Sequence, residues 1–563
     1  MWYYMSMLKE EMQNLFRLDE KAIAENQVSS GLLMALDNYL ELVCTQGDYI
    51  TEEAFSVYKK FVSMKQEAPE SMKKNLFLAM NNYVKEKIFN QEYADALFMH
   101  RFLVVKFVLP AESFNQMATV LSALGNNDLA SEFIKLYELK ETNKPLMLLT
   151  VGNFYNLQLK DYKNAIKYYE KYVEIDQTKS VVYTILASLY AKLYGDLSLK
   201  DQVAYFTKAY HLKPKERLTL HGLAFAYDKL GDRVNANKFY LELLENNPTT
   251  NDFYNYGAFL ISCGDFVLGH KYFTKRFELA DRNLRYPLFE DIGRKWDCRS
   301  NISDKILLVH YEQGFGDTFM YCRFVPALKK YAKKVIFVVQ DEVYDLLKTS
   351  KLINDGVVLV NESKFKDKKM KYDVHMALLD APYALGCSVE DIPYCEGYLV
   401  PPSSKVKAYA KFHINRSKKL KVGVAYAGDK LANYNSRDID FGRIKNILKS
   451  EDIEFYSLQV GYEEEGINSL GYTFENFTDT ACAIKNMDVV ISTDNVILNL
   501  AGALGVRTLG LFNKFTNYRW YKLDGQDVGW YKSVKPLQVE ENNCWRDVFA
   551  QVNNILSESI QNK

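Results

Sequence analysis

The spacing of hydrophobic positions changes once along the chain, close to residue 303. Before this point, apolar residues recur three and four positions apart, which is the spacing that gives a helix one apolar face. After Ile306, short runs rich in β-branched residues alternate with helical runs. Such alternation is typical of parallel sheets covered by helices. The pattern therefore predicts an α + α/β chain, helical in its first half.

Residues 147–283 repeat at a nearly constant interval. Ala224 and Gly257 lie 33 residues apart, and Pro214 and Pro248 lie 34 apart. Gly-Asp pairs mark the turns, small residues stand where two helices must touch, and aromatic residues fill the gaps between them. This unit resembles the tetratricopeptide repeat, although the first unit lacks its terminal proline and the second has an insertion near 194–200. We therefore expect tetratricopeptide repeats over 147–290.

The segment before these repeats is also helical in pattern. Residues 28–45, 51–65, 72–89 and 91–108 each carry apolar positions on one helical face. We interpret 1–146 as degenerate helical pairs that continue the solenoid. A separate helical bundle is the alternative.

The second half of the chain divides into two sets of strands. The first set is predicted at 305–310, 334–340, 356–360 and 372–376. After Pro401-Pro402 the pattern starts again, with strands at 420–426, 453–459, 488–492 and 507–512 and helices at 440–450, 479–487, 495–505 and 544–557. These sets predict two Rossmann-like domains, 303–415 and 416–563, which bind ligands at the carboxyl ends of their strands.

Composition excludes several classes of protein. Lys and Arg total 71, as do Asp and Glu, and this balance argues against a nucleic-acid-binding protein. The eight cysteines form no Cys-x-x-Cys pair, which favours reduced thiols. No apolar run reaches the ~18 residues that span a bilayer, and no signal peptide is evident at the N-terminus. We therefore expect a cytoplasmic protein that has no contact with a membrane.

The segment KILLVHYEQGFGDT, residues 305–318, combines a strand, a glycine turn and the start of a helix. Glycines such as Gly314 and Gly316 let the backbone approach a ligand closely, and Asp317 and Thr318 open the amphipathic segment 318–330. Such a turn suits a phosphate or a sugar. A tight turn without any ligand is the alternative.

Several motifs in order resemble one family. Residues 296–326 and 477–512, together with KVGVAYAG at 421–428, SLQ at 457–459 and YRWY at 518–521, are similar to bacterial tetratricopeptide-repeat glycosyltransferases. These proteins are related to the heptosyltransferases of glycosyltransferase family 9. The resemblance implies a GT-B fold and an inverting transfer that needs neither a metal nor a bound cofactor.

The resemblance also implies a role for Asp317. Sugar transfer requires the acceptor hydroxyl to lose its proton, and a carboxylate within hydrogen-bond reach can accept it. Asp317 matches the family's proposed base. The alternative is a helix cap for the N–H groups of Thr318 to Met320, because Asp is favoured at that position.

The donor site implied by the resemblance lies mainly in the second sheet domain. Asp494 and Asn495 stand where the diphosphate binds, with a helix-capping role alone as the alternative. Asn495 and Asn499 replace the Thr and His of related sequences, and Asn cannot carry a positive charge. Arg437 matches the cation for the leaving phosphates, with Lys430 as a weaker candidate. The remaining donor candidates are Tyr426, Gly428, Gln459, Asp479 and Thr480, of which Asp479 and Thr480 could instead cap a helix.

Two further patterns do not predict a metal site. Asp438 and Asp440 form an Asp-x-Asp motif, but it falls in the turn before a helix, where Asp is a common cap. The seven histidines have no ligand spacing, and His310, beside the glycine turn, is best interpreted as a buried histidine.

The sequence thus predicts a glycosyltransferase that takes a nucleotide sugar and modifies a hydroxyl of a protein recruited by the repeats. A cell-surface glycan acceptor is the second possibility. A scaffold or peptide-binding protein that kept the fold without turnover is the first rival, and a transferase that modifies nucleic acid is the other.

Overall fold

The computed structural model describes residues 70–97, 109–278, 294–350, 356–368, 370–428, 438–445, 450–462, 466–514, 516–520, 529–539 and 544–562. Two compact units divide the chain, Met1–Leu223 and Ala224–Lys563, and each is considered by itself. The helices predicted at 28–45 and 51–65, and residues 98–108 of the helix predicted at 91–108, lie outside the described residues.

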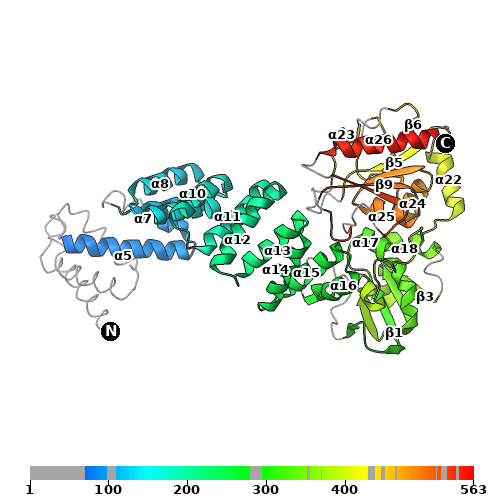
Figure 1. The fold of residues 1–563 in the computed structure, drawn as a ribbon, viewed down its shortest axis with the longest axis horizontal. Coiled ribbons are helices and arrows are strands. Elements are labelled where there is room, and N and C mark those ends of the chain that lie inside the picture. The colour runs from blue at the N-terminus through cyan, green and yellow to red at the C-terminus, as the bar shows by residue number, and fades with distance from the viewer. Residues whose placement is uncertain are drawn as a thin grey trace, which may run out of the picture. The chain divides into compact units, whose positions relative to one another are not determined.

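The first unit is built from helices in every part that the structure describes (Figure 1). Consecutive helices pack as pairs, α7 with α8, α9 with α10, and α11 with α12. The elements are α5 (Glu70–Phe89), α7 (Ala111–Ala123), α8 (Asn127–Lys140), α9 (Lys144–Asn153), η1 (Phe154–Leu159), α10 (Tyr162–Ile175), α11 (Ser180–Tyr194), η2 (Gly195–Ser198), α12 (Leu199–Leu212) and the beginning of α13 (Arg217–Leu230). The helical prediction for 72–89 is confirmed by α5.

Small residues set the spacing of the helix pairs in the first unit, as the repeat pattern predicts. A Cβ atom added at Gly152 would lie 3.0 Å from the ring of Tyr169, which is fully buried. The insertion predicted near 194–200 forms the short 3-10 helix η2 between α11 and α12.

Helical repeats continue at the start of the second unit as α14 (Arg233–Glu245), α15 (Thr250–Ser262), α16 (Phe266–Phe273) and η3 (Thr274–Glu278). The Gly-Asp turns have one clear physical cause. Gly231 and Gly264 have φ of 80° and 86°, a left-handed conformation that strains other residues. The following Asp232 and Asp265 accept a hydrogen bond from the third N–H of the next helix, which is the N-cap arrangement.

The contact between α15 and α16 gives a prediction for stability. A Cβ atom at Gly257 would lie 2.7 Å from the backbone nitrogen of Phe273, and backbone cannot move aside as a side chain can. Gly257→Ala should therefore lower the free energy of unfolding by about 1–3 kcal/mol. Gly428→Ala is the matched control, because the nearest atom to a Cβ there is Oδ1 of Asp438 at 3.7 Å, an ordinary contact distance. Equal urea midpoints for the two variants would contradict the close contact.

Two separate parallel sheets follow in the second unit (Figure 1). The first has the order β3-β2-β1-β4 and consists of β1 (Ile302–His310), β2 (Ala332–Val339), β3 (Val357–Asn361) and β4 (Val374–Ala377). Its other elements are α17 (Phe315–Tyr321), η5 (Cys322–Lys330), α18 (Asp341–Thr349), α20 (Glu362–Lys368), η6 (Leu378–Asp380) and α21 (Ala381–Leu385). The helix α22 (Ser403–His413) leads to the second sheet.

The second sheet has the order β10-β9-β8-β5-β6-β7. Its strands are β5 (Leu420–Ala425), β6 (Ile453–Ser457), β7 (Asn468–Ser469), β8 (Val489–Thr493), β9 (Thr508–Phe512) and β10 (Val534–Gln538). Its helices are α23 (Phe441–Lys445), η8 (Gly471–Thr473), α24 (Phe477–Ile484), α25 (Val496–Ala503) and α26 (Trp545–Gln561). Every strand predicted from the sequence is present, whereas β7 and β10 were not predicted.

Helices cover both faces of the second sheet. Buried residues of α26 pack with those of β5, β6, β8 and β9 in one core, and α24 and α25 contribute to the other core, which extends into the first sheet domain. In each sheet the chain builds strands outward on one side and then crosses to the other, between β1 and β4 and between β5 and β8. The carboxyl ends at these crossings are where such sheets bind ligands.

Candidate functional site

The carboxyl ends of the two sheets are brought together by α17, which follows β1, and α25, which follows β8 (Figure 1). The ring of Phe315 in α17 lies 4.9 Å from that of Phe477 in α24, edge to face. The ring of Phe319 contacts the same ring at 5.1 Å. An apolar contact thus holds the predicted glycine turn of the first sheet against the predicted donor side of the second.

The two glycines of the turn differ in what the structure requires of them. A Cβ atom at Gly316 would lie 3.1 Å from Nδ2 of Asn499, whereas one at Gly314 would have no neighbour within 4 Å. Glycine at 316 therefore lets α17 approach α25. Thr318 is buried, and its hydroxyl donates to Oε1 of Gln340 at 2.9 Å, so it supports the turn from inside the first domain.

Asp317 does not cap a helix in the way that the alternative prediction supposed. α17 begins at Phe315 with Gly314 as its N-cap, three residues before the predicted start, so Asp317 lies inside the first turn. Its carboxylate Oδ1 lies 2.5 Å from Nε of Arg519, and the two side chains are 15% and 14% exposed. The predicted base is therefore held in an ion pair between the two sheet domains.

Arg519 belongs to the YRWY segment and was not singled out in the sequence. Its Nη1 donates to Oδ1 of Asn517 at 3.0 Å, and its Nη2 donates to Oε1 of Gln313. Burial by itself would lower the pKa of Arg519, but the negative charge of Asp317, together with Tyr518, Tyr321 and Asp494, raises it. The guanidinium is thus a permanent cation beside the glycine turn.

The next residue fastens the same loop to the second sheet. The indole Nε1 of Trp520 donates to Oδ1 of Asp494 at 2.8 Å, and Trp520 is 3% exposed. Its ring also packs on Phe512 at the end of β9, at 5.0 Å. Asp494 is therefore close to Arg519, and its charge contributes to the raised pKa of that residue.

The two asparagines that depart from the related pattern both serve the fold. Oδ1 of Asn495 accepts from the N–H groups of Ile497 at 2.8 Å and Leu498 at 3.3 Å, which makes it the N-cap of α25. Asn499 donates to the carbonyl oxygen of Asn495 at 3.2 Å and accepts from the hydroxyl of Tyr531 at 3.2 Å. A role for either residue in donor binding stays a prediction.

The candidates after β5 and β6 form one hydrogen-bonded group. Oε1 of Gln459 accepts from the N–H groups of Tyr426 at 3.2 Å and Ala427 at 3.1 Å. The N–H of Gly428 donates to Oδ1 of Asp438 at 2.8 Å. Gln459 and Asp438 thus fix the loop at the carboxyl end of β5, one of the two strands between which the crossing lies.

Asp479 and Thr480 lie in the first turn of α24. The N-cap is Asn476, whose side chain accepts from the N–H of Thr478 at 2.8 Å, while Asp479 accepts from the N–H of Glu475 at 3.1 Å. The hydroxyl of Thr480 donates to the carbonyl oxygen of Asn476 at 3.4 Å. Neither residue is therefore the N-cap of α24, and a role for either in donor binding stays a prediction.

Two of the predicted cations, Arg437 and Lys430, lie outside the described residues. Within the described parts, no group of three or more His, Cys, Asp or Glu residues is arranged to hold a metal ion. His310 is buried, and its Nδ1 lies 3.0 Å from the carbonyl oxygen of Tyr311. Burial lowers the pKa of His310 to about 3, so the residue is the buried histidine that the sequence suggested.

A buried ion cluster beside the glycine turn was missed by sequence reasoning. Arg276 of η3 binds both carboxylate oxygens of Glu312 at 2.7 Å, and its Nη1 lies 2.6 Å from Oδ1 of Asp380. These side chains are 0–1% exposed. Burial raises the pKa of Glu312, although Arg276 opposes this shift. The acid in HYEQGFGDT that precedes the glycines therefore joins the last repeat to the first sheet domain.

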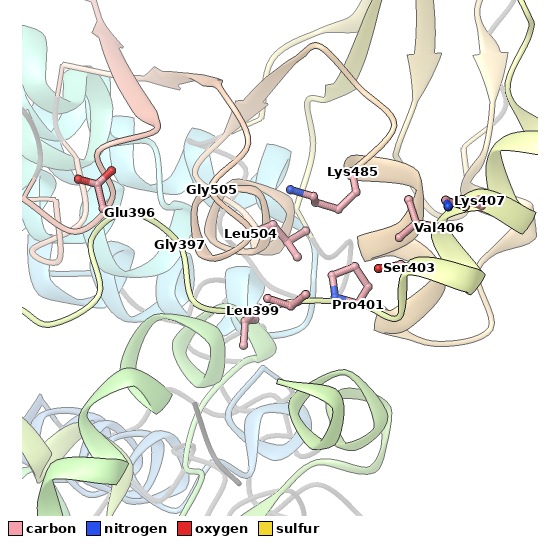
Figure 2. Close-up of a pocket in the computed structure, with 11 residues that line it drawn as sticks. Glu396, Gly397, Leu399, Pro401, Ser403, Val406, Lys407, Lys485, Leu504 and Gly505 are labelled. Atoms are coloured by element: carbon pink, nitrogen blue, oxygen red, sulfur yellow. The ribbon is translucent and has the colours of Figure 1, made fainter. Parts of the chain in front are cut away.

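A separate pocket of about 490 Å³ lies away from these residues (Figure 2). Leu399 and Pro401 of the segment between the sheets line it together with Leu504 and Gly505 after α25 and Lys485 after α24. Because α25 is eight residues long, this end lies ~12 Å from its N-cap at Asn495. None of the predicted site residues lines this pocket.

Residues 147–179 match the tetratricopeptide repeat family, and the chain therefore contains this repeat where the sequence pattern predicts it. Protein FlbA of Caulobacter vibrioides is 22% identical over 383 residues, which cover 62% of this chain. The match spans 63% of the length of FlbA. In the described part of the chain, no helix is long and apolar enough to cross a membrane.

Solved structures resemble separate parts of the chain. A glycosyl transferase of family 9 from Veillonella parvula has 10% identity and a TM-score of 0.36, and the match covers 47% of this chain and 99% of that one. The C-terminal part of a repeat-containing protein from Cytophaga hutchinsonii has 20% identity and a TM-score of 0.32, over 42% and 87%. MamA from Desulfovibrio magneticus has 21% identity and a TM-score of 0.26, over 30% and 92%. Similarity at this level does not decide what the chain binds or catalyses.

Proposed function

We propose that this chain is a cytoplasmic glycosyltransferase that moves a sugar from a nucleotide-sugar donor to a hydroxyl of a protein bound by the helical repeats. One observation carries the proposal: a carboxylate and a guanidinium, Asp317 and Arg519, meet 2.5 Å apart where the carboxyl ends of two parallel sheets face each other. A group that accepts a proton and a group that binds an anion are the two requirements of transfer from a sugar diphosphate.

The proposed reaction needs no atom beyond donor and acceptor. The acceptor oxygen forms a bond to the anomeric carbon as the bond from that carbon to the diphosphate oxygen breaks. Asp317 takes the proton of the acceptor hydroxyl, and the nucleoside diphosphate leaves with the electron pair. Attack from the side opposite the leaving group inverts the anomeric carbon, and the cation stabilises the charge that develops on the diphosphate.

A non-catalytic binding protein is the second candidate function, and specific contacts favour it. The side chain of Asn499 is bonded to Asn495 and Tyr531, and Asp317 is paired with Arg519. In this alternative the protein keeps the fold of a glycosyltransferase but does not catalyse sugar transfer, and its repeats bind a partner protein.

Release of nucleoside diphosphate separates the two functions. The full chain is incubated with a panel of nucleotide sugars and with an extract as the source of acceptor, and product and modified protein are followed by mass spectrometry. We expect one donor to be consumed with a matching mass increase on an acceptor protein. Binding of a donor without consumption of any donor would favour the non-catalytic protein, and binding of none would contradict both donor-based readings.

A further inference from the structure

The contacts of Arg519 and its neighbour place it between the glycine turn of the first sheet domain and the 494–495 turn of the second. Its Nη2 donates to Gln313, which directly precedes the glycine turn of the first domain. Its neighbour Trp520 is bonded to Asp494, at the start of α25 in the second domain. The guanidinium therefore lies where a ligand that bridges the glycine turn and the 494–495 turn would pass.

The guanidinium is arranged as a receptor for an oxyanion. Gln313 and Asn517 are neutral amides, and Asp317 forms the ion pair. A planar fork of N–H donors matches two oxygens of a phosphate. Asp317 thus occupies the position that an anionic ligand would take.

Two buried phenols stand beside this ion pair. The hydroxyl oxygens of Tyr321 and Tyr518 are buried, and within the described residues neither has a hydrogen-bond partner. Burial raises the pKa of both phenols, and the charges of Arg519 and Asp317 act on both as well. Both phenols are therefore neutral donors close to the carboxylate, and a buried donor without a partner favours any acceptor that becomes available.

We propose that Arg519 is the anion receptor of the cleft: it exchanges Asp317 for the diphosphate of the donor, and the exchange releases Asp317 to accept the acceptor's proton. This inference rests on the proposed function and adds an order of events to it. Before the donor binds, the ion pair keeps the base occupied, so water is not activated in the empty site. After the donor binds, Tyr321 and Tyr518 supply the hydrogen bonds that the carboxylate has lost.

The direction in which Asp317→Asn changes the affinity for pyrophosphate separates this receptor from an ion pair that only supports the fold. Asp317→Asn removes the competing charge, so binding of inorganic pyrophosphate, measured by calorimetry at fixed ionic strength, should tighten by roughly 10- to 100-fold, the value of one charge-assisted hydrogen bond. Arg519→Gln should abolish the binding. The double variant Asp317→Asn/Arg519→Gln leaves neither partner of the ion pair as an unpaired charge. It should also lose pyrophosphate binding, and it provides the test if the single Arg519 variant does not fold.

Arg507→Gln is the matched control, because Arg507 donates to Ser559 on α26 and precedes β9, at the opposite end from the cleft. Its pyrophosphate affinity should equal that of the unmodified chain. Unchanged or weaker binding by Asp317→Asn, or normal binding by the double variant, would overturn the inference. The proposed function fails separately, if no nucleotide sugar is consumed while the pyrophosphate results hold.

Discussion

Replacing Asp317 by Asn is expected to reduce sugar transfer by at least ~10², because the amide cannot accept the proton of the acceptor hydroxyl. The same variant should also be less stable. Asn leaves the largely buried Arg519 without its charged partner, and such a loss costs about 1–3 kcal/mol. The measurement is turnover and urea midpoint on the same preparations.

The matched control for this substitution is Asp232→Asn. Asp232 is the N-cap of α14, and Asn caps helices about as well as Asp does, so both turnover and midpoint should stay close to their normal values. Near-normal turnover of the Asp317 variant would refute its role as the base. If the urea midpoint of Asp317→Asn changed as little as that of Asp232→Asn, the ion pair between Asp317 and Arg519 would contribute nothing to stability in solution.

Replacing Arg276 by Met is expected to lower the free energy of unfolding of the second unit by about 3–5 kcal/mol. Arg276 is 0% exposed and neutralises Glu312 and Asp380, which are each 1% exposed. Its removal leaves the buried Glu312 without a cation, and leaves Asp380 with only Lys295, whose Nζ lies 3.8 Å from Oδ2 of Asp380. Four of the five tryptophans lie after residue 224, so the urea midpoint followed by tryptophan fluorescence reports mainly on this unit.

An exposed ion pair in the same unit provides the comparison. Lys532 and Glu396 are 65% and 75% exposed and lie 2.5 Å apart, and Lys532→Met should leave the urea midpoint close to that of the unmodified chain, because exposed ion pairs contribute little. Adding Glu312→Gln to Arg276→Met should restore part of the loss, because one uncompensated charge disappears. An Arg276 variant whose midpoint moves no more than that of Lys532→Met would contradict the cluster.

The arrangement of elements was predictable because local spacing carries it. Apolar residues three and four apart gave the helices, and the Gly-Asp pairs at 231–232 and 264–265 gave their turns, since only a left-handed residue followed by a cap fits there. The eight strands predicted in the second half are all present. The short edge strand β7 and the strand β10, which is interrupted by Pro536, have weak patterns and were not predicted.

The candidate site was predictable only in part. The sequence indicated the glycine turn and the 494–495 turn, and the structure brings the helices that follow them into contact. The sequence predicted a helix that begins at Thr318, with Asp317 as its possible cap. In the structure the helix begins at Phe315, so Asp317 lies inside it. α17 then gives way to the 3-10 helix η5, which contains Pro326.

The sequence by itself determined the order of secondary-structure elements, because the spacing of hydrophobic residues predicts each type. Helical repeats come first, and two sets of strands follow, with a glycine turn after the first strand. What only the tertiary structure decided is the partner of each charge. Arg519 meets Asp317, and Asp380 meets Arg276 across 104 positions. The physical reason is that a periodic pattern records which face of an element is buried, whereas an ion pair depends on where separate elements come to lie. Asp317 and Glu312 look alike in the sequence, but the side chain of Asp317 is 15% exposed and that of Glu312 is 1% exposed.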